Sequence, residues 1–129
     1  MRFFLTITLL FITMMVSLEL VSAQPSGRTF NTVTESLVEG KADQLADYFA
    51  QRVEISINGT TRVYNRSQAR HVMRDFFQKY PPEGFSLRHR GSTGDTTFII
   101  GRYRSRSGSF DVNIFMNNRS EEVVEIRFE

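Results

Sequence analysis

Cysteine is absent from this chain of 129 residues, and histidine occurs only twice. Without thiols the chain forms no disulfide and offers no thiolate ligand to zinc or to an iron–sulfur cluster. Two histidines are also too few for a dedicated metal centre, so we expect no metal and no cofactor. A Gly-rich phosphate loop, a paired-histidine metalloprotease motif and a nucleophile elbow are missing as well. We therefore predict no catalytic residue.

A strong net charge is missing too. The 16 basic residues exceed the 14 acidic ones only slightly, and the formal net charge is +2. This balance argues against a nucleic-acid partner, because binding to a phosphate backbone depends on concentrated positive charge. Among the basic residues only Lys41 and Lys79 are lysines. Arginine pairs bidentately with carboxylates and phosphates, so its dominance indicates either surface ion pairs or a site for an anionic ligand.

The first residues have the composition of a secretory signal peptide. Arg2 supplies a positive start, Phe3–Leu18 is a largely apolar run, and Val21-Ser22-Ala23 places small residues at a cleavage site. We predict a signal peptide over residues 1–23, cleavage near Ala23, and export to the periplasm or the outside of the cell. The apolar run is shorter than the roughly 20 residues of a transmembrane helix, so we expect no stable membrane insertion after cleavage. An uncleaved membrane anchor is the alternative.

The remainder has the length of a single domain, which we place at residues 30–129 behind a loose polar leader over 24–29. Phe30, Val33 and Leu37 recur at helical spacing, and Gly40 follows as a helix stop. Apolar residues at positions 42, 45, 46 and 49 form a second stripe. Residues 29–50 therefore predict two short helices, or one helix bent at Gly40.

The hydrophobic period changes to that of β-strands at Val53. Residues 53–57 and 60–64 flank Asn58-Gly59, which is typical of a β-hairpin. Ser67 is the expected N-cap of a third helix, which ends before Pro81-Pro82. Four more strands are expected at 85–91, 96–106, 109–117 and 121–128.

The lengths of the turns between these strands predict the register of the sheet. They place Tyr103 opposite Val112, and Arg104 opposite Asp111 on the polar side. The apolar residues then share an inner face that holds Phe85, Leu87, His89, Ile99, Tyr103, Phe110, Val112, Ile114, Val124, Ile126 and Phe128. Three helices packed on one face of a strongly curved, mostly antiparallel sheet make an α+β fold.

This order of elements, αα-ββ-α-ββββ, resembles the nuclear transport factor 2-like superfamily, whose fold is cystatin-like. More narrowly, the chain is similar to a family of small exported bacterial proteins of unknown function. The resemblance rests on GKADQLADYF from Gly40, VEISI from Val53, Gln68-Ala69, Asp75-Phe76-Phe77, Pro81-Pro82, Phe85, His89, Gly91 and Gly101. It implies a helical layer over a bent sheet, with a cavity between them. The superfamily holds isomerases, dehydratases, partner-binding scaffolds and dimerising proteins, so the fold alone selects no function.

His89, Thr97 and Tyr103 are the candidate ligand-binding residues, because the predicted register brings them to the inner face. An isomerase or dehydratase needs a base in such a pocket, near a group that orients it. His89 lies beside Thr97 in this register, and no inward carboxylate accompanies it. A structural histidine, a ligand contact, and an isomerase- or dehydratase-type enzyme with a cavity near His89 all stay open.

Arginines also recur at spacings that gather them on one surface. Arg66, Arg70 and Arg74 follow one flank of the third helix, and arginines at 102, 104 and 106 alternate along one strand. A solvated face with ion pairs and an arginine-lined anion site both stay open. His71 and Asp75, four residues apart, predict an exposed helical pair.

Four apolar residues interrupt the polar pattern of the predicted outer face, namely Phe98, Ile100, Phe115 and Val123. Exposed apolar patches of this kind mark interfaces, unless a bulge or the leader covers them. We therefore expect a non-enzymatic ligand-binding or protein-interaction module. Its partner is a second copy in a homodimer, another protein, or a small hydrophobic or anionic ligand. The small-molecule enzyme and the anion binder are the alternatives.

Overall fold

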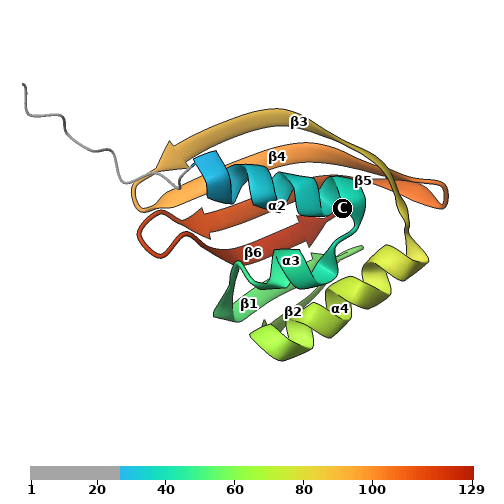
Figure 1. Cartoon of the computed structure of the whole chain (residues 1–129), viewed down its shortest axis with the longest axis horizontal. Helices are drawn as coiled ribbons and strands as arrows, with labels where there is room; N and C mark the ends of the chain where they lie inside the picture. Colours follow the sequence, from blue (N-terminus) through green and yellow to red (C-terminus); the bar gives the residue numbers. More distant parts are fainter. Residues whose placement is uncertain (1–26) are drawn as a thin grey trace, which may run out of the picture.

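A computed structural model describes residues 27–129. The predicted signal peptide and residues 24–26 of the predicted leader lie outside the described residues. The elements follow in the order α2 (Gly27–Glu39), α3 (Ala42–Ala46), β1 (Phe49–Ile57), β2 (Thr60–Asn65), α4 (Arg66–Lys79), β3 (Pro82–Thr93), β4 (Thr96–Ser105), β5 (Gly108–Asn117) and β6 (Glu122–Phe128). This order confirms the predicted α+β fold (Figure 1). The first helix already begins at Gly27, within the stretch predicted as a leader.

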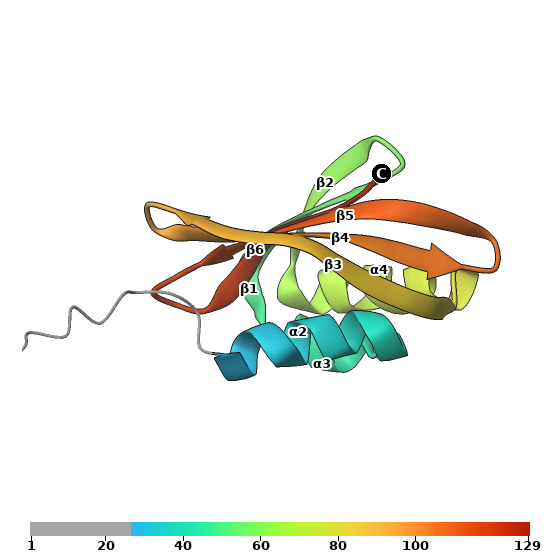
Figure 2. The same cartoon turned by 90° about the horizontal axis from the view of Figure 1, so that it is seen from above.

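The six strands form one open sheet in the order β2-β1-β6-β5-β4-β3. Neighbouring strands run antiparallel except β1 and β6, which run parallel. Figure 2 shows the three described helices on one side of the curved sheet. We call the covered side the inner face and the opposite side the outer face.

Gly40 ends α2 and turns the chain into α3. Its φ of +68° lies in the left-handed region that glycine enters without steric cost. The Lys41 N–H donates to the Ser36 carbonyl at 2.9 Å, which is the bond of a Schellman helix end. A Cβ at position 40 would lie 3.1 Å from the Pro82 ring, so the turn packs closely on the start of β3. Of the two predicted arrangements, two short helices is the correct one.

A capping box around Asn65 begins α4. The Asn65 side chain accepts from the Gln68 N–H at 2.8 Å, and the Gln68 side chain accepts from the Asn65 N–H at 3.3 Å. The prediction of Ser67 as the N-cap is therefore wrong by two residues. Asparagine caps a helix as well as serine does, and only Asn65 has a glutamine three residues later to close the box.

Apolar side chains from the helices and the inner face form one core. Val33 and Leu37 come from α2, Leu45 from α3, and Met73 and Phe76 from α4. The strands supply the buried residues Phe49, Val53, Ile55, Ile99, Tyr103, Phe110, Val112, Ile114, Met116, Val123, Ile126 and Phe128. Burial of one such side chain contributes roughly 1.5–3 kcal/mol. The core therefore holds the domain together without disulfides.

A β-bulge at Arg88 reverses the faces of the second half of β3. Leu87 pairs with Gly101 and His89 pairs with Ile100, so Arg88 is the extra residue. His89 is consequently exposed on the outer face, and its predicted inward position is wrong. Leu87 keeps its inner-face register but is 46% exposed, because β3 is an edge strand.

A second bulge exchanges two valines of β6. Phe115 pairs with Glu125 and Met116 pairs with Val123, which leaves Val124 as the extra residue. Val123 is fully buried, whereas Val124 is 39% exposed. The predicted inner position of Val124 and the predicted outer position of Val123 are wrong for this reason.

The register of β4 and β5 differs from the prediction by two residues. Tyr103 pairs with Phe110 rather than Val112, and Asp111 pairs with Arg102 rather than Arg104. Side chains alternate between the two faces with a period of two. An error of two residues therefore changes which residues pair, but each side chain stays on its predicted face. The predicted inner residues of both strands are buried.

Candidate functional site

Aromatic rings occupy the centre of the space between the helices and the sheet, where the resemblance implies a cavity. Tyr103 on β4 is fully buried there. Its ring centroid lies 5.6 Å from that of Phe76 on α4 and 6.1 Å from that of Phe128 on β6. Phe110 on β5 joins this cluster at 5.4 Å from Phe76. Tilted and edge contacts of this kind stabilise a packed core, and Tyr103 has no surface left to offer a ligand.

The hydroxyl of Tyr103 is also engaged. It donates to the Tyr80 carbonyl at 2.5 Å, at the C-terminal end of α4. Burial raises the pKa of the Tyr103 phenol well above its ordinary value, because the phenolate would lose its hydration. We assign this hydroxyl a structural role, which is to position the end of α4 on the sheet.

Thr97 lies near the other end of β4 in a buried polar network. Its hydroxyl donates to Asn118 Oδ1 at 2.5 Å and lies 2.9 Å from the Ser92 hydroxyl. The Asn118 amide in turn donates to the Gly94 carbonyl at 3.2 Å. These bonds join the β3–β4 turn to the β5–β6 turn, so the polar atoms of Thr97 are used within the fold.

His89 lies on the opposite face from Thr97 and Tyr103. Its ring contacts that of Phe98, with centroids 5.5 Å apart. Its imidazole makes no hydrogen bond or ion pair with any residue from 27 to 129. An isomerase or dehydratase base needs an orienting partner, and the His89 imidazole has none among the described residues. The structure therefore does not bring the three predicted ligand-binding residues together.

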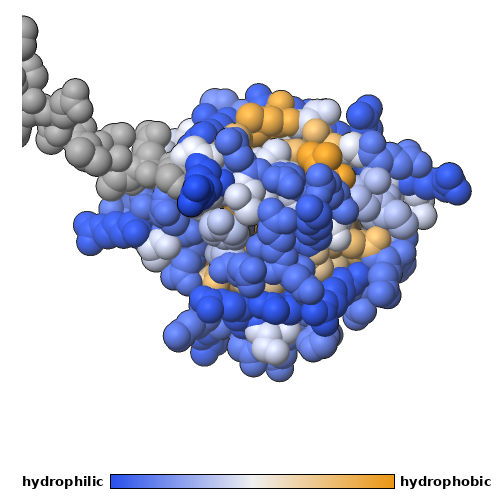
Figure 3. Space-filling view, in the orientation of Figure 1, coloured by the Kyte–Doolittle hydropathy of each residue, from blue (hydrophilic) through white to orange (hydrophobic). Residues whose placement is uncertain are grey.

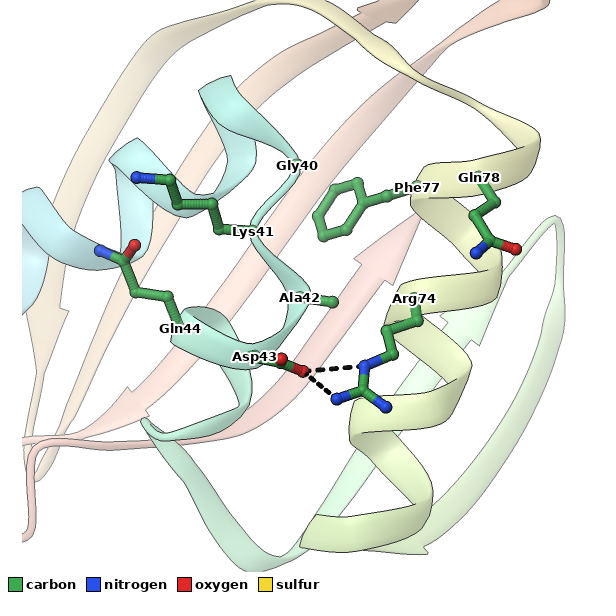
Figure 4. Close-up of a pocket in the computed structure, with 8 residues that line it drawn as sticks. All are labelled: Gly40, Lys41, Ala42, Asp43, Gln44, Arg74, Phe77 and Gln78. Carbon is green, nitrogen blue, oxygen red and sulfur yellow. Dashed lines mark hydrogen bonds and ion pairs between the residues drawn. The ribbon is translucent and has the colours of Figure 1, made fainter.

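One pocket lies between the α2–α3 turn and α4 (Figure 4). It has a volume of about 510 Å³ and is lined by Gly40, Lys41, Ala42, Asp43, Gln44, Arg74, Phe77 and Gln78. Arg74 binds Asp43 across it, with Nε at 2.8 Å and Nη2 at 2.6 Å from Oδ1. This ion pair neutralises the arginine, which disfavours an anionic ligand. The amides of Gln44 and Gln78 remain as the unbonded polar side chains of the lining.

A second pocket, of about 270 Å³, lies between α4 and the β1–β2 turn. Its lining is mainly apolar and consists of Ile57, Asn58, Val72, Asp75, Phe76, Lys79 and Tyr80. Asp75 and His71 are exposed, as the sequence predicts, but no hydrogen bond or ion pair joins their side chains. Neither this pocket nor the first is lined by His89, Thr97 or Tyr103.

The arginines of α4 pair with acids from other elements. Arg70 binds Asp47 at 3.1 Å, and Arg66 binds Glu122 of β6 at 3.1 Å. Together with Arg74 they clamp α4 to the α3 region and to the sheet. The predicted stripe is present, but its charges are engaged, and this argues against an anion-binding surface on α4.

On the helix side the surface is mostly hydrophilic, with an apolar patch between α2 and β3 (Figure 3). Val38 on α2 is 44% exposed, and Leu87 on β3 is 46% exposed. Nearby along the same two elements, the Arg90 guanidinium lies 4.1 Å from the centre of the Phe30 ring. The α2 helix and the edge strand β3 are therefore adjacent along apolar side chains, with a cation–π contact at one end.

One row of residues crosses the outer face over all six strands. Strand pairing aligns Gly91, Phe98, Phe115, Glu125, Glu54 and Val63 from β3 to β2. Phe98 and Phe115 are half-buried at its centre, and Ile100 is half-buried in the next row. We call Phe98, Ile100 and Phe115 the outer patch. Val123, which the sequence assigns to this patch, is buried in the core instead.

Basic residues gather on the outer face at the β3–β4 end. Arg88 and Arg102 both contact Asp111, at 3.6 Å and 2.8 Å. The hydrogen bond from Arg102 is the main cause that lowers the pKa of the Asp111 carboxyl. Arg104 adds a further guanidinium, which lies over Gly84. We call these three arginines with Asp111 the basic end.

Acidic residues gather at the β1–β6 end of the same face. Glu54 and Glu125 are direct neighbours across the parallel strand pair. Arg127 binds Glu125, and this hydrogen bond raises the pKa of the Arg127 guanidinium. We call these three residues the acidic end. The outer patch therefore lies between surfaces of opposite net charge.

Residues 30–129 match the model of a domain of unknown function, DUF4783. The chain belongs to this family. A DUF4783 family protein from Bacteroides ovatus is similar to it with a TM-score of 0.72 and 25% identity, over 75% of this chain and 90% of that one. A DUF4783 family protein from Bacteroides fragilis has a TM-score of 0.71 and 25% identity, over 75% of this chain and 93% of that one. No curated protein matches this DUF4783 chain.

More distant structures share the fold. A nuclear transport factor 2-like protein of unknown function from Burkholderia xenovorans has a TM-score of 0.60 and 15% identity, over 79% of each chain. The predicted resemblance is confirmed: this DUF4783 chain belongs to an unknown-function family with a nuclear transport factor 2-like fold. A likeness at this identity shows the fold alone, so function has to be argued from the surface of the domain.

Within residues 27–129, no helix is both long enough and apolar enough to cross a membrane. The same residues contain no group of three or more His, Cys, Asp or Glu side chains arranged to hold a metal ion.

Proposed function

We propose that this DUF4783 domain is an exported, non-enzymatic interaction module that forms a homodimer through the outer face of its sheet. The observation that carries the proposal is the outer patch of Phe98, Ile100 and Phe115, which lies on a face that no described helix covers. Covering an apolar patch of this kind is favourable. Export rests on the signal-peptide pattern of residues 1–23.

The packing of the interior supports a non-enzymatic role. Tyr103 is enclosed by aromatic rings and bonded to the Tyr80 carbonyl. Thr97 is enclosed in its own network, and His89 points to the other face. A catalytic site needs reactive groups that converge on one accessible point, and these residues diverge.

The charges of the outer face support a second copy as the partner. A twofold axis that lies parallel to the face, between its basic and acidic ends, brings the basic end of one copy over the acidic end of the other. Such an isologous contact is complementary in charge on both sides of the apolar centre. The same surface is therefore suited to its own copy.

The oligomeric state in solution tests the proposal. We expect the mature protein to sediment as a dimer and Phe115→Asp to sediment as a monomer with an unchanged circular dichroism spectrum, because a buried unpaired carboxylate opposes association. Val38→Asp is the matched control, since Val38 is 44% exposed on α2, far from the outer patch, and it should remain dimeric. A wild-type protein that stays monomeric at high concentration would falsify the proposal.

A charge exchange tests the orientation of the two copies. Glu54→Lys and Arg104→Glu each place like charges at the contact twice in a homodimer, so each variant alone should be monomeric. An equimolar mixture restores opposite charges at both contacts, and we expect a heterodimer. If mixing the two variants leaves both monomeric, the twofold arrangement is incorrect, even where the wild type is a dimer.

A further inference from the structure

The two edges of the sheet differ in how they are protected against pairing. β3 forms one edge, and its pairing with β4 is interrupted by two register shifts. It begins at Pro82 and carries the exposed charges Glu83 and Arg88. Proline, bulges and charges are the devices that keep a strand edge from accepting another strand. The β3 edge is therefore closed to a partner.

β2 forms the other edge and has few of these devices. It pairs with β1 from Asn65 to Thr60 without a register shift. Its residues, TTRVYN, include no proline or glycine and are mostly β-branched or aromatic. No element within residues 27–129 pairs with its free side. Figure 2 shows β2 at the end of the sheet, where alternate N–H and C=O groups of an edge strand point outward.

The inner side of β2 carries a charge without a partner. Arg62 pairs in register with Ile55, and Tyr64 pairs with Val53, so both face the helix side. Arg62 is exposed, and its side chain makes no hydrogen bond or ion pair with any described residue. A strand added next to β2 would therefore meet a guanidinium that has no partner among residues 27–129.

We propose that the β2 edge binds an extended acidic segment of a partner protein as a seventh strand of the sheet. The backbone of β2 supplies the hydrogen bonds, and Arg62 selects a carboxylate opposite it on the inner face of the added strand. A second copy of β2 is the poorer occupant, because antiparallel self-pairing centred on residue 62 would bring two Arg62 side chains together and offers no carboxylate. The site is separate from the outer patch that forms the proposed dimer.

The test uses blocked heptapeptides that alternate valine and threonine, with one central residue that is either glutamate or lysine. We expect the glutamate peptide to bind the mature protein about fivefold more tightly than the lysine peptide, from the worth of cross-strand charge pairs. Arg62→Glu should reverse this preference. Amide hydrogen exchange should slow at residues 60–65 on binding and stay unchanged at residues 82–93. Affinity is measured by fluorescence anisotropy of labelled peptides.

Two controls distinguish strand addition from nonspecific peptide binding. Two glutamate peptides are N-methylated on alternate residues, one on the odd and one on the even positions. In one of them the methyl groups replace the N–H groups that face β2, and this peptide should not bind. The Phe115→Asp protein should bind like the wild type, so failure of the proposed dimer leaves this result intact. Any of four results would overturn the proposal. They are equal binding of the glutamate and lysine peptides, binding of both methylated peptides, protection from exchange at β3 instead of β2, and no binding of any peptide.

Discussion

The ring of Phe85 fills the space above Gly101 on the neighbouring strand. A Cβ on Gly101 would lie 2.3 Å from Phe85 Cζ and 2.7 Å from the Ser86 carbonyl oxygen. The outer face holds the reverse arrangement, since a Cβ on Gly91 of β3 would lie 2.5 Å from the Phe98 ring of β4. Each strand of the pair thus supplies one glycine and receives one aromatic ring, which lets both rings lie flat on the sheet.

Gly101→Val should destabilise the domain by about 2 kcal/mol or more, because the new side chain must displace a ring and a strand backbone. The loss would be measured as the free energy of unfolding in denaturant. Gly27→Val is the control, since a Cβ at Gly27 has nothing within 4 Å. Similar stability of the two variants would contradict the close approach of Phe85.

Tyr103→Phe should cost about 1–2 kcal/mol, the range for leaving a buried carbonyl without its hydrogen bond. The carbonyl concerned is that of Tyr80, which accepts from the Tyr103 hydroxyl at 2.5 Å. Tyr64→Phe is the matched control, since the half-buried Tyr64 makes no hydrogen bond with another described side chain through its hydroxyl. Denaturant melts of both variants would show whether the hydroxyl positions α4, and an unchanged Tyr103→Phe protein would rule this out.

His89→Gln should change the stability by less than about 0.5 kcal/mol, as for surface substitutions in general. His89 is exposed and contacts only the ring of Phe98 among aromatic neighbours. The enzyme alternative predicts a reaction that this variant loses. A substrate screen on hydroxy-carbonyl compounds, run on both proteins, distinguishes the two, and turnover that disappears in a well-folded variant means that the non-enzymatic proposal is wrong.

Asp111 should link stability to acid pH through Arg102. The hydrogen bond from Arg102 lowers the pKa of Asp111 in the folded state. A depressed folded pKa means that the contribution is complete above the unfolded value of about 3.9 and is lost as the pH falls through the folded pKa. Arg102→Gln should therefore move the Asp111 pKa upward in an NMR titration. An unchanged titration would show that the contact has no effect on ionisation.

Cleavage after Ala23 should leave a mature chain that begins at Gln24. The small residues of Val21-Ser22-Ala23 are the reason, because signal peptidase needs them next to the cut bond. Intact-mass measurement of protein recovered from the cell envelope and the medium identifies the first residue. A chain that still begins at Met1 and fractionates with membranes would instead support the uncleaved anchor.

The order of the elements could be read from the sequence because it depends on local chemistry. The spacing of Val33 and Leu37 indicates a helix, Gly40 ends it, and Asn58-Gly59 closes a hairpin. These signals act over a few residues, so they hold in any tertiary context. The predicted outer position of Phe98 and Phe115 and the inner position of Tyr103 are also correct, because the register errors there are even numbers of residues.

The faces of the residues at the two bulges depend on tertiary packing. Arg88 and Val124 are the extra residues of the bulges, and the alternation of polar and apolar residues in the sequence does not reveal them. Each bulge moves the neighbouring side chains of its strand to the opposite face of the sheet. Their placement depends on how distant strands fit together, through the ring of Phe85 over Gly101 and the contact of Val123 with the core. For this reason the sequence determined a sheet with one apolar face, whereas the packing of that sheet decided that His89 lies outside the core and that Tyr103 is sealed within it.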